Sequence, residues 1–242
     1  MKNSKVLKGL TVPVLDKGYV RLIDWLGDDQ RIVETARISY KSPSKGSETD
    51  KKLLFYLWKH QHTSPFEACN LSFNIKMPIF VMRQFVRHRT FKINEQSARY
   101  SEMEPEFYIP SSWREQDTKN KQSSIHKGDW NPEIGCWGPT ATGTLESFCS
   151  YSYDIYKSLL KAGIAKEMAR MILPINLYTE IYVNCDLHNL MNFLKLRMDS
   201  HAQWEIQQYA HIMYKIMERL YPLTAEAFKK YKFEIKETNE NN

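Results

Sequence analysis

The most chemically informative stretch of the chain runs from residue 82 to residue 102 and reads MRQFVRHRTFKINEQSARYSE. It holds four arginines and a histidine, and like charges that close repel one another unless an anion lies among them. Arginine offers planar N–H forks that match phosphate, and the interleaved amides and hydroxyls suit a heterocycle or a sugar. The stretch therefore indicates an anion site with hydrogen-bonding specificity. The alternative is a basic surface turn whose arginines pair with carboxylates elsewhere.

Two elements are expected to position the first half of this stretch. Alternating apolar residues predict a half-buried strand over 69–77. Pro78 suits the first turn of a helix, which is expected to continue over 79–89. In that helix Arg83 and Arg87 share one face at a spacing of four residues.

The second half of the stretch is expected to be irregular over 90–96 and extended over 97–103, with Ser97 and Arg99 pointing the same way. Hydrophobic periodicity and capping residues predict the other elements. These are helices over 28–40, 49–61, 140–162, 165–173, 187–198 and 201–221, and extended segments over 12–27, with a turn at Gly18, and over 178–185.

The length of 242 residues suits one domain with a real core. We expect a single catalytic domain over 13–230, preceded by an N-terminal extension over 1–12 and followed by a tail over 231–242. Residues 113–138 are polar and contain several glycines, which indicates a loop insertion. The sequence contains no GxGxxG and no P-loop, so no Rossmann crevice is expected.

The stretch also carries a resemblance to a known family. Arg87-His88-Arg89, seven residues and then Ser97 form an RHR-x7-S pattern, which resembles the signature of the flavin-dependent thymidylate synthases. The similarity extends to HQHTSPFE upstream and to LMNFLKLRMDSHAQWEIQQYA downstream, and it covers most of the chain between residues 15 and 228. It implies an α/β fold in which helices pack a small mixed sheet, within a subunit of a homotetramer.

The resemblance implies reductive methylation of dUMP at C5 to give dTMP. Methylenetetrahydrofolate would supply the carbon, and FAD reduced by NADPH would supply the hydride. A cofactor that performs the redox step leaves the protein with positioning and electrostatics. Arg197 is the expected catalytic residue, because a fixed guanidinium at the uracil carbonyl edge stabilises negative charge that develops on the ring.

The other site residues are carried over from the resemblance residue by residue. The expected dUMP contacts are Gln84, Phe85, Val86, Arg87, Glu95, Gln96, Ser97, Ala98, Arg99, Arg170 and Arg197. The expected FAD contacts are His62, Ser64, Arg87, His88, Arg89, Glu95, Asp186, Leu187, His188, Asn192 and His201. Arg99 and Arg170 are the expected phosphate ligands.

Two of these positions leave alternatives open. Asp186-Leu187-His188 replaces the Asn-x-Arg of many relatives, so a histidine stands where a permanent cation is expected. His201 either orients Arg197, stacks near the flavin, or is a core histidine with satisfied hydrogen bonds.

No metal site is expected. His60 and His62 are two residues apart and do not share a helix face, so only a loop would bring them to a metal together with Cys69. The four cysteines contain no CxxC, and none has Arg, Lys or His within two residues. Because an activated thiol needs such a neighbour, we expect packing cysteines in a reducing compartment, and we disfavour a Cys-dependent methylase.

The net charge of +6 suits an anionic ligand and is also compatible with weak attraction to nucleic acid. The charges are interspersed, and Asn94 and Glu95 interrupt the basic run, so nucleic acid is not the expected partner. No apolar run is long enough to span a bilayer and no secretory signal is recognisable, so a cytoplasmic protein is expected. The rival functions are a nucleotide or flavin binder without catalysis and an RNA or DNA binder.

Overall fold

The fold is built on a five-stranded sheet, seen in a computed structural model that describes residues 7–40, 46–118, 120–121 and 123–231. Every pairing in the sheet is antiparallel, so the helices pack an antiparallel sheet, and the expectation of a mixed sheet is wrong. The strands follow the order β1 (Thr11–Val14), β2 (Gly18–Leu26), β3 (Asn70–Pro78), β7 (Tyr178–Asp186) and β4 (Lys92–Glu95).

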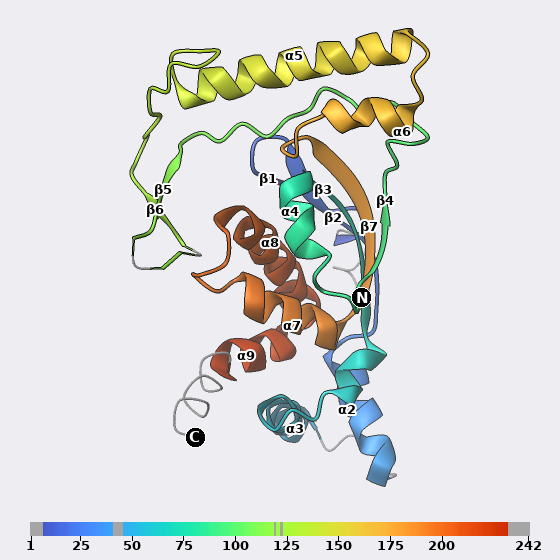
Figure 1. Cartoon of the computed structure of the whole chain (residues 1–242). Coiled ribbons are helices and arrows are strands. Elements are labelled where there is room, and N and C mark those ends of the chain that lie inside the picture. The colour runs from blue at the N-terminus through green and yellow to red at the C-terminus, as the bar shows by residue number, and fades with distance from the viewer. Residues whose placement is uncertain (1–6, 41–45, 119, 122, 232–242) are drawn as a thin grey trace.

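Helices cover one face of this sheet. Figure 1 shows three of them, α4 (Ile79–Phe85), α7 (Leu187–Arg197) and α8 (Trp204–Leu220), packed on the same side. Near the end of the sheet where β7 leads into α7 lie α2 (Asp29–Arg37), η1 (Ile38–Tyr40), α3 (Ser47–Lys59), η2 (Ser64–Ala68) and α9 (Pro222–Tyr231).

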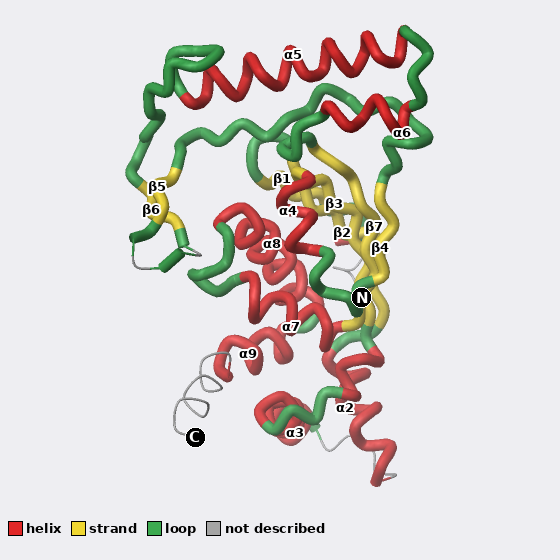
Figure 2. Tube along the Cα trace, in the orientation of Figure 1, coloured by secondary structure: helices red, strands yellow, loops and turns green. Residues whose placement is uncertain are grey.

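The remaining elements form an outer layer at the opposite end. The long helix α5 (Ala141–Lys161) lies beyond the sheet, with α6 (Lys166–Ala169) and η3 (Arg170–Ile172) between it and β7. Figure 2 shows a separate two-stranded hairpin of β5 (Arg114–Gln116) and β6 (Ser124–His126) beside the helical face. This hairpin lies inside the segment that the sequence predicted as a loop insertion.

The strand β3 explains how the core forms. Its residues Leu71, Phe73, Ile75 and Met77 are fully buried, as the alternation predicts. Asn74, on the side predicted to be polar and solvated, is also fully buried. It accepts a hydrogen bond of 3.0 Å from the Tyr19 hydroxyl and donates one of 2.8 Å to Glu180, which satisfies its amide.

Local signals set three of the helix ends. The Asp28 side chain accepts from the backbone N–H of Arg31 at 3.0 Å and caps α2, and Thr140 caps α5 in the same way. Gly163 has φ of +83° and ends α5. Gly18 is not the turn residue, because β2 begins there; a Cβ at this position would lie 2.2 Å from the Tyr209 hydroxyl.

Several predicted boundaries are wrong. Helix α4 ends at Phe85 and not at Arg89, so Arg83 and Arg87 do not share a helix face. Residues 92–95 form the edge strand β4 and are not irregular, because they pair with β7. Residues 97–101 are a turn and not an extended segment: the N–H groups of Tyr100 and Ser101 both donate to the carbonyl of Ser97.

Two helix starts also differ. Helix α3 begins at Ser47, before the predicted residue 49, and α8 begins at Trp204, after the predicted His201. Residues 1–6 and 232–242 lie outside the described residues, so the limits of the extension and the tail stay predictions. No helix in the described ranges is long and apolar enough to cross a membrane.

Candidate active site

Arg197 lies at the C-terminal end of α7, where its side chain turns toward the end of α4. Its Nε donates to Nε2 of His88 at 3.0 Å. Its Nη2 donates to the backbone oxygen of Gln84 at 3.3 Å, and Nη1 lies 3.5 Å from the side-chain oxygen of the same residue. In the described part of the chain Arg197 has no carboxylate partner. Among the described residues, only neutral groups form hydrogen bonds with this half-buried guanidinium.

The ring of His88 is held in place and accepts the hydrogen bond from Arg197. Its ring lies against Phe193 at 4.9 Å and Phe91 at 5.8 Å between centroids. Burial, and then the positive charge of Arg197, lower the pKa of His88 from 6.5 to about 4. The imidazole is therefore neutral at pH 7. Because Nε2 accepts from Arg197, the proton of the neutral ring lies on Nδ1.

A second cluster of predicted residues surrounds the turn at Ser97. A cavity of about 280 Å³ there is lined by five predicted nucleotide contacts, Glu95, Gln96, Ser97, Ala98 and Arg170. Thr179 on β7 donates to Glu95 at 2.8 Å, and the backbone N–H of Gln96 donates to the carbonyl of Glu180 at 2.9 Å. The edge pairing of β4 with β7 therefore positions the turn.

The two expected phosphate ligands meet at one residue of α6. Arg99 donates from Nε to the Glu167 carboxylate at 3.1 Å, and Nε of Arg170 donates to the Glu167 carbonyl at 3.3 Å. The side chains of Arg99 and Glu167 are both more than half exposed. An exposed ion pair of this kind contributes only about 0–1 kcal/mol, so it leaves Arg99 free to exchange its partner for a stronger anion.

The remaining arginines of the signature point to solvent. Arg87 and Arg89 are exposed and form no ion pair with any carboxylate of the described residues. The alternative of a basic turn paired with carboxylates elsewhere therefore does not describe these two residues.

Two further predicted nucleotide contacts, Phe85 and Val86, differ in exposure. The side chain of Phe85 is fully buried, whereas Val86 is 40% exposed.

The predicted flavin residues lie in two further places. His62 and Ser64 line a cavity of about 720 Å³ at the start of η2. At the start of α7, Asp186 caps the helix and Leu187 is buried. His188 lies 3.0 Å from Asn192 through Nε2, and its buried Nδ1 has no hydrogen-bond partner among the described residues.

His201 is exposed in the segment between α7 and α8. It precedes α8, its side chain is 63% exposed, and its Nδ1 lies 2.8 Å from the Asp199 carboxylate. The alternative of a core histidine is therefore wrong. The hydrogen bonds that orient Arg197 within this chain come from His88 and Gln84 and not from His201.

Comparisons with known proteins decide which family these features belong to. Residues 21–223 match a family model described as Thymidylate synthase complementing protein. The chain belongs to this family.

Two relatives show how far the similarity extends. A flavin-dependent thymidylate synthase from Thermus thermophilus is 48% identical over 225 residues, which cover 93% of this chain and 80% of the relative. Another from Thermosipho africanus is 46% identical over 220 residues, covering 91% of this chain and 94% of the relative. The resemblance stated from the RHR-x7-S signature is thereby confirmed.

Solved structures agree with the fold. Two structures of the UMP/dUMP methylase PolB from Streptomyces cacaoi, one bound with 5-Br dUMP and one with 5-Br UMP, match with TM-scores of 0.74 and 0.76. They are 29% and 30% identical and cover 90% and 91% of this chain and 97% and 98% of their own chains.

In this member of the thymidylate synthase complementing protein family the cysteines lie outside the two clusters. Cys69, Cys149 and Cys185 are buried, and burial raises the pKa of each thiol, that of Cys69 to about 12. A thiol with a raised pKa is a poor nucleophile at neutral pH. Cys136 is exposed and its carbonyl accepts from the Thr144 hydroxyl. Among the described residues no cluster of His, Cys, Asp or Glu is arranged to hold a metal ion.

Sequence reasoning missed one residue next to the catalytic candidate. Gln203 accepts a hydrogen bond from the side-chain amide of Gln84, although the two are 119 positions apart. The only signal was its place within the downstream segment that resembles the family, where it had no assigned role.

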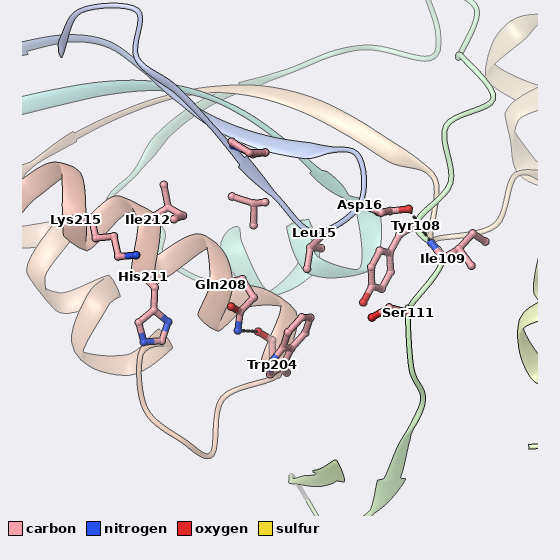
Figure 3. Close-up of a pocket in the computed structure, with 12 residues that line it drawn as sticks. Leu15, Asp16, Tyr108, Ile109, Ser111, Trp204, Gln208, His211, Ile212 and Lys215 are labelled. Atoms are coloured by element: carbon pink, nitrogen blue, oxygen red, sulfur yellow. Dashed lines mark hydrogen bonds between the residues drawn. The ribbon is translucent and has the colours of Figure 1, made fainter. Parts of the chain in front are cut away.

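A further cavity of about 630 Å³ lies between the β1–β2 turn, residues 108–111 and α8 (Figure 3). None of the predicted site residues lines it.

Proposed function

We propose that this protein is a flavin-dependent thymidylate synthase that methylates C5 of dUMP, with methylenetetrahydrofolate as carbon donor and FAD reduced by NADPH as hydride source. Family membership and relatives at 46–48% identity support the reaction. The observation that carries the proposal is the Arg197 guanidinium, held by neutral His88 and by Gln84 without a carboxylate partner in the described chain.

The residues present fit a flavin nucleotide. Arg87 and Arg89 are exposed guanidiniums without carboxylate partners among the described residues, and they suit a pyrophosphate. The buried Nδ1 of His188, next to Asn192, has no hydrogen-bond partner in the described part of the chain, and His62 and Ser64 line a cavity. These residues would hold the FAD, which when bound supplies the hydride that completes the methyl group.

Arg197 would act on the uracil ring. Its Nε is used by His88, whereas the bonds from its two Nη atoms are long at 3.3 and 3.5 Å. These donors would stabilise negative charge on a ring carbonyl oxygen as C5 becomes nucleophilic. A carboxylate beside Arg197 would cancel this effect, whereas neutral His88 fixes the guanidinium and leaves its charge available.

The Ser97 cavity would bind the nucleotide, with Arg99 and Arg170 as phosphate ligands. In this proposal Arg99 forms its ion pair with Glu167 when no substrate is bound. When dUMP binds, its phosphate replaces the Glu167 carboxylate as the partner of Arg99. Ser97 would be a ligand contact and not a nucleophile, since no step requires covalent attack by a hydroxyl.

The predicted contacts occupy separate places on one chain: the Arg197 cluster, the Ser97 cavity, the start of α7 and the His62 cavity. The proposal therefore includes a homotetramer whose active sites draw residues from several subunits. It also includes a cytoplasmic location, because the substrates are free nucleotides and folate, and it includes neither nucleic acid nor membrane as a partner.

The experiment is anaerobic incubation of the purified protein with FAD, NADPH, methylenetetrahydrofolate and dUMP labelled with tritium at C5. Formation of dTMP and release of tritium are expected, and omission of NADPH, methylenetetrahydrofolate or dUMP should abolish dTMP. A flavin or nucleotide binder without catalysis would retain FAD but release no tritium, and that result would refute the proposal.

A further inference from the structure

A series of hydrogen bonds leads from Arg197 to the hairpin β5–β6. The side-chain oxygen of Gln84 faces Nη1 of Arg197, and Nε2 of Gln84 donates to Oε1 of Gln203. Nε2 of Gln203 donates in turn to Oε2 of Glu205 at 2.9 Å. The series ends on the hairpin, where Nη2 of Arg114 lies 2.6 Å from Oε1 of Glu205.

The two ends of this series determine how both amides are oriented. A guanidinium only donates and an ionised carboxylate only accepts. Arg197 therefore requires the oxygen of Gln84, and Glu205 requires an N–H from Gln203. Both requirements are met together only when Nε2 of Gln84 faces Oε1 of Gln203, which is the arrangement found. The amide orientations thus follow from the charges at the ends and not from an arbitrary choice between two similar atoms.

Glu205 is a rigid anchor for the series. It is only 3% exposed, and besides Gln203 and Arg114 it accepts from the Tyr108 hydroxyl at 3.3 Å. A buried carboxylate with this many donors has one stable position.

Gln203 is the N-cap residue of α8 and has extended backbone angles, so its side chain leaves the helix toward α4. The guanidinium of Arg114 also lies 5.3 Å from the ring of Trp204.

We infer that Gln203 is a positioning residue for the methylation, which acts through Gln84 to hold the Arg197 guanidinium, and that Glu205 and Arg114 anchor it. This inference rests on the proposed function. It gives the hairpin inside residues 113–138 a role, because Arg114 fixes the far end of the series. Loss of the Gln203 amide frees Gln84 to rotate and lets Arg197 move, which lowers kcat while the phosphate ligands keep the affinity for dUMP.

The test is a double-mutant cycle of Gln203→Met, Gln84→Met and the double variant. Methionine keeps the length of the side chain and removes both polar atoms. Gln203→Met should lower kcat by about tenfold with KM for dUMP nearly unchanged, and the double variant should be no slower than Gln84→Met alone, because both changes break the same connection. Losses that multiply, or a Gln203→Met enzyme as fast as the wild type, would overturn the inference.

The matched control is Gln208→Met, on the same helix and equally half-buried. Its Nε2 donates to the carbonyl of Trp204 at 3.2 Å (Figure 3). Among the described residues its side chain forms no hydrogen bond with Gln84. This variant should keep the wild-type kcat. If Gln203→Met is too unstable for kinetics, Glu205→Gln takes its place in the cycle, because a neutral amide can donate as well as accept and no longer fixes the orientation of Gln203.

A readout that needs no turnover separates this inference from the proposed function. The charge of Arg197 helps to keep the pKa of His88 low. A displaced guanidinium should raise that pKa toward 6.5, measured by NMR titration of the ring in Gln203→Met against Gln208→Met. If the wild type forms no dTMP, the proposed function fails, and the titration still decides the inference: an unchanged pKa in Gln203→Met would reject it.

Discussion

Nε of Arg197 donates a hydrogen bond of 3.0 Å to Nε2 of His88, so the guanidinium is paired with a neutral ring and with no carboxylate of the described residues. The ring is held by Phe193 and Phe91, and burial keeps it uncharged. Such a pair fixes the direction of the guanidinium without neutralising it. The arrangement suits a residue that must meet negative charge developing on a substrate.

The first prediction concerns Arg197 itself. Arg197→Lys should lower kcat by about 10²–10³-fold, the usual cost of losing a positioned donor to an oxyanion, because an ammonium keeps the charge but not the planar fork. Arg219→Lys, an exposed substitution on α8, is the control and should leave kcat unchanged. Steady-state dTMP formation measures both. An Arg197→Lys enzyme within a few-fold of the wild type would exclude this role.

The second prediction is a pH dependence of stability from His88. Its pKa is about 4 in the folded protein and 6.5 in the unfolded chain, so between these values the unfolded state binds more protons. The contribution of His88 to the free energy of unfolding is fully present above pH 6.5 and is lost as the pH falls toward 4. His88→Gln, which cannot titrate, should show a shallower loss of Tm across this window. Equal slopes for both proteins would show that His88 is not held neutral.

The third prediction uses the competition at Arg99. Glu167→Gln removes the carboxylate that pairs with Arg99 and should lower KM for dUMP by up to about fivefold, the range of an exposed ion pair. Glu34→Gln, exposed on α2, makes the same change in net charge and serves as the control. Arg99→Met should have the opposite effect and raise KM by about 10–100-fold, because a charge-assisted hydrogen bond to phosphate is lost. Unchanged KM in both Arg99→Met and Glu167→Gln would remove Arg99 from the phosphate site.

The fourth prediction concerns the cysteines. Three are buried with raised pKa values, so no reactive thiolate is expected from them at neutral pH. Cys69→Ala, Cys149→Ala, Cys185→Ala and Cys136→Ser, made one at a time, should each keep kcat within about threefold, because no step needs a thiol nucleophile. A folded single variant that forms no dTMP would point to a Cys-dependent methylation instead.

Most of the fold could be predicted where the signal is local. The alternation in β3, the caps at Asp28 and Thr140, and the stop at Gly163 each act within a few residues of the chain. Elements fixed by distant partners could not be predicted. Residues 92–95 read Lys-Ile-Asn-Glu, which has no strand signal, and they form β4 because the edge of β7 offers backbone partners.

The same distinction applies to the site. The RHR-x7-S signature indicated which residues to examine, but the pairing of Arg197 with His88 joins positions 109 apart and has no local signal. The start of α8 was placed too early because Asp199 accepts the backbone N–H of His201 at 3.0 Å and holds a turn before the helix. Gln203 became visible only when the structure brought it to Gln84.

The most direct test of the central claim is a visible absorption spectrum of the purified protein, recorded without oxygen before and after addition of NADPH. The account predicts flavin bands that bleach with NADPH, followed by dTMP on addition of dUMP and methylenetetrahydrofolate. A protein that stays colourless after incubation with FAD would contradict it. The exposed arginines Arg87 and Arg89 would then have to serve another anion.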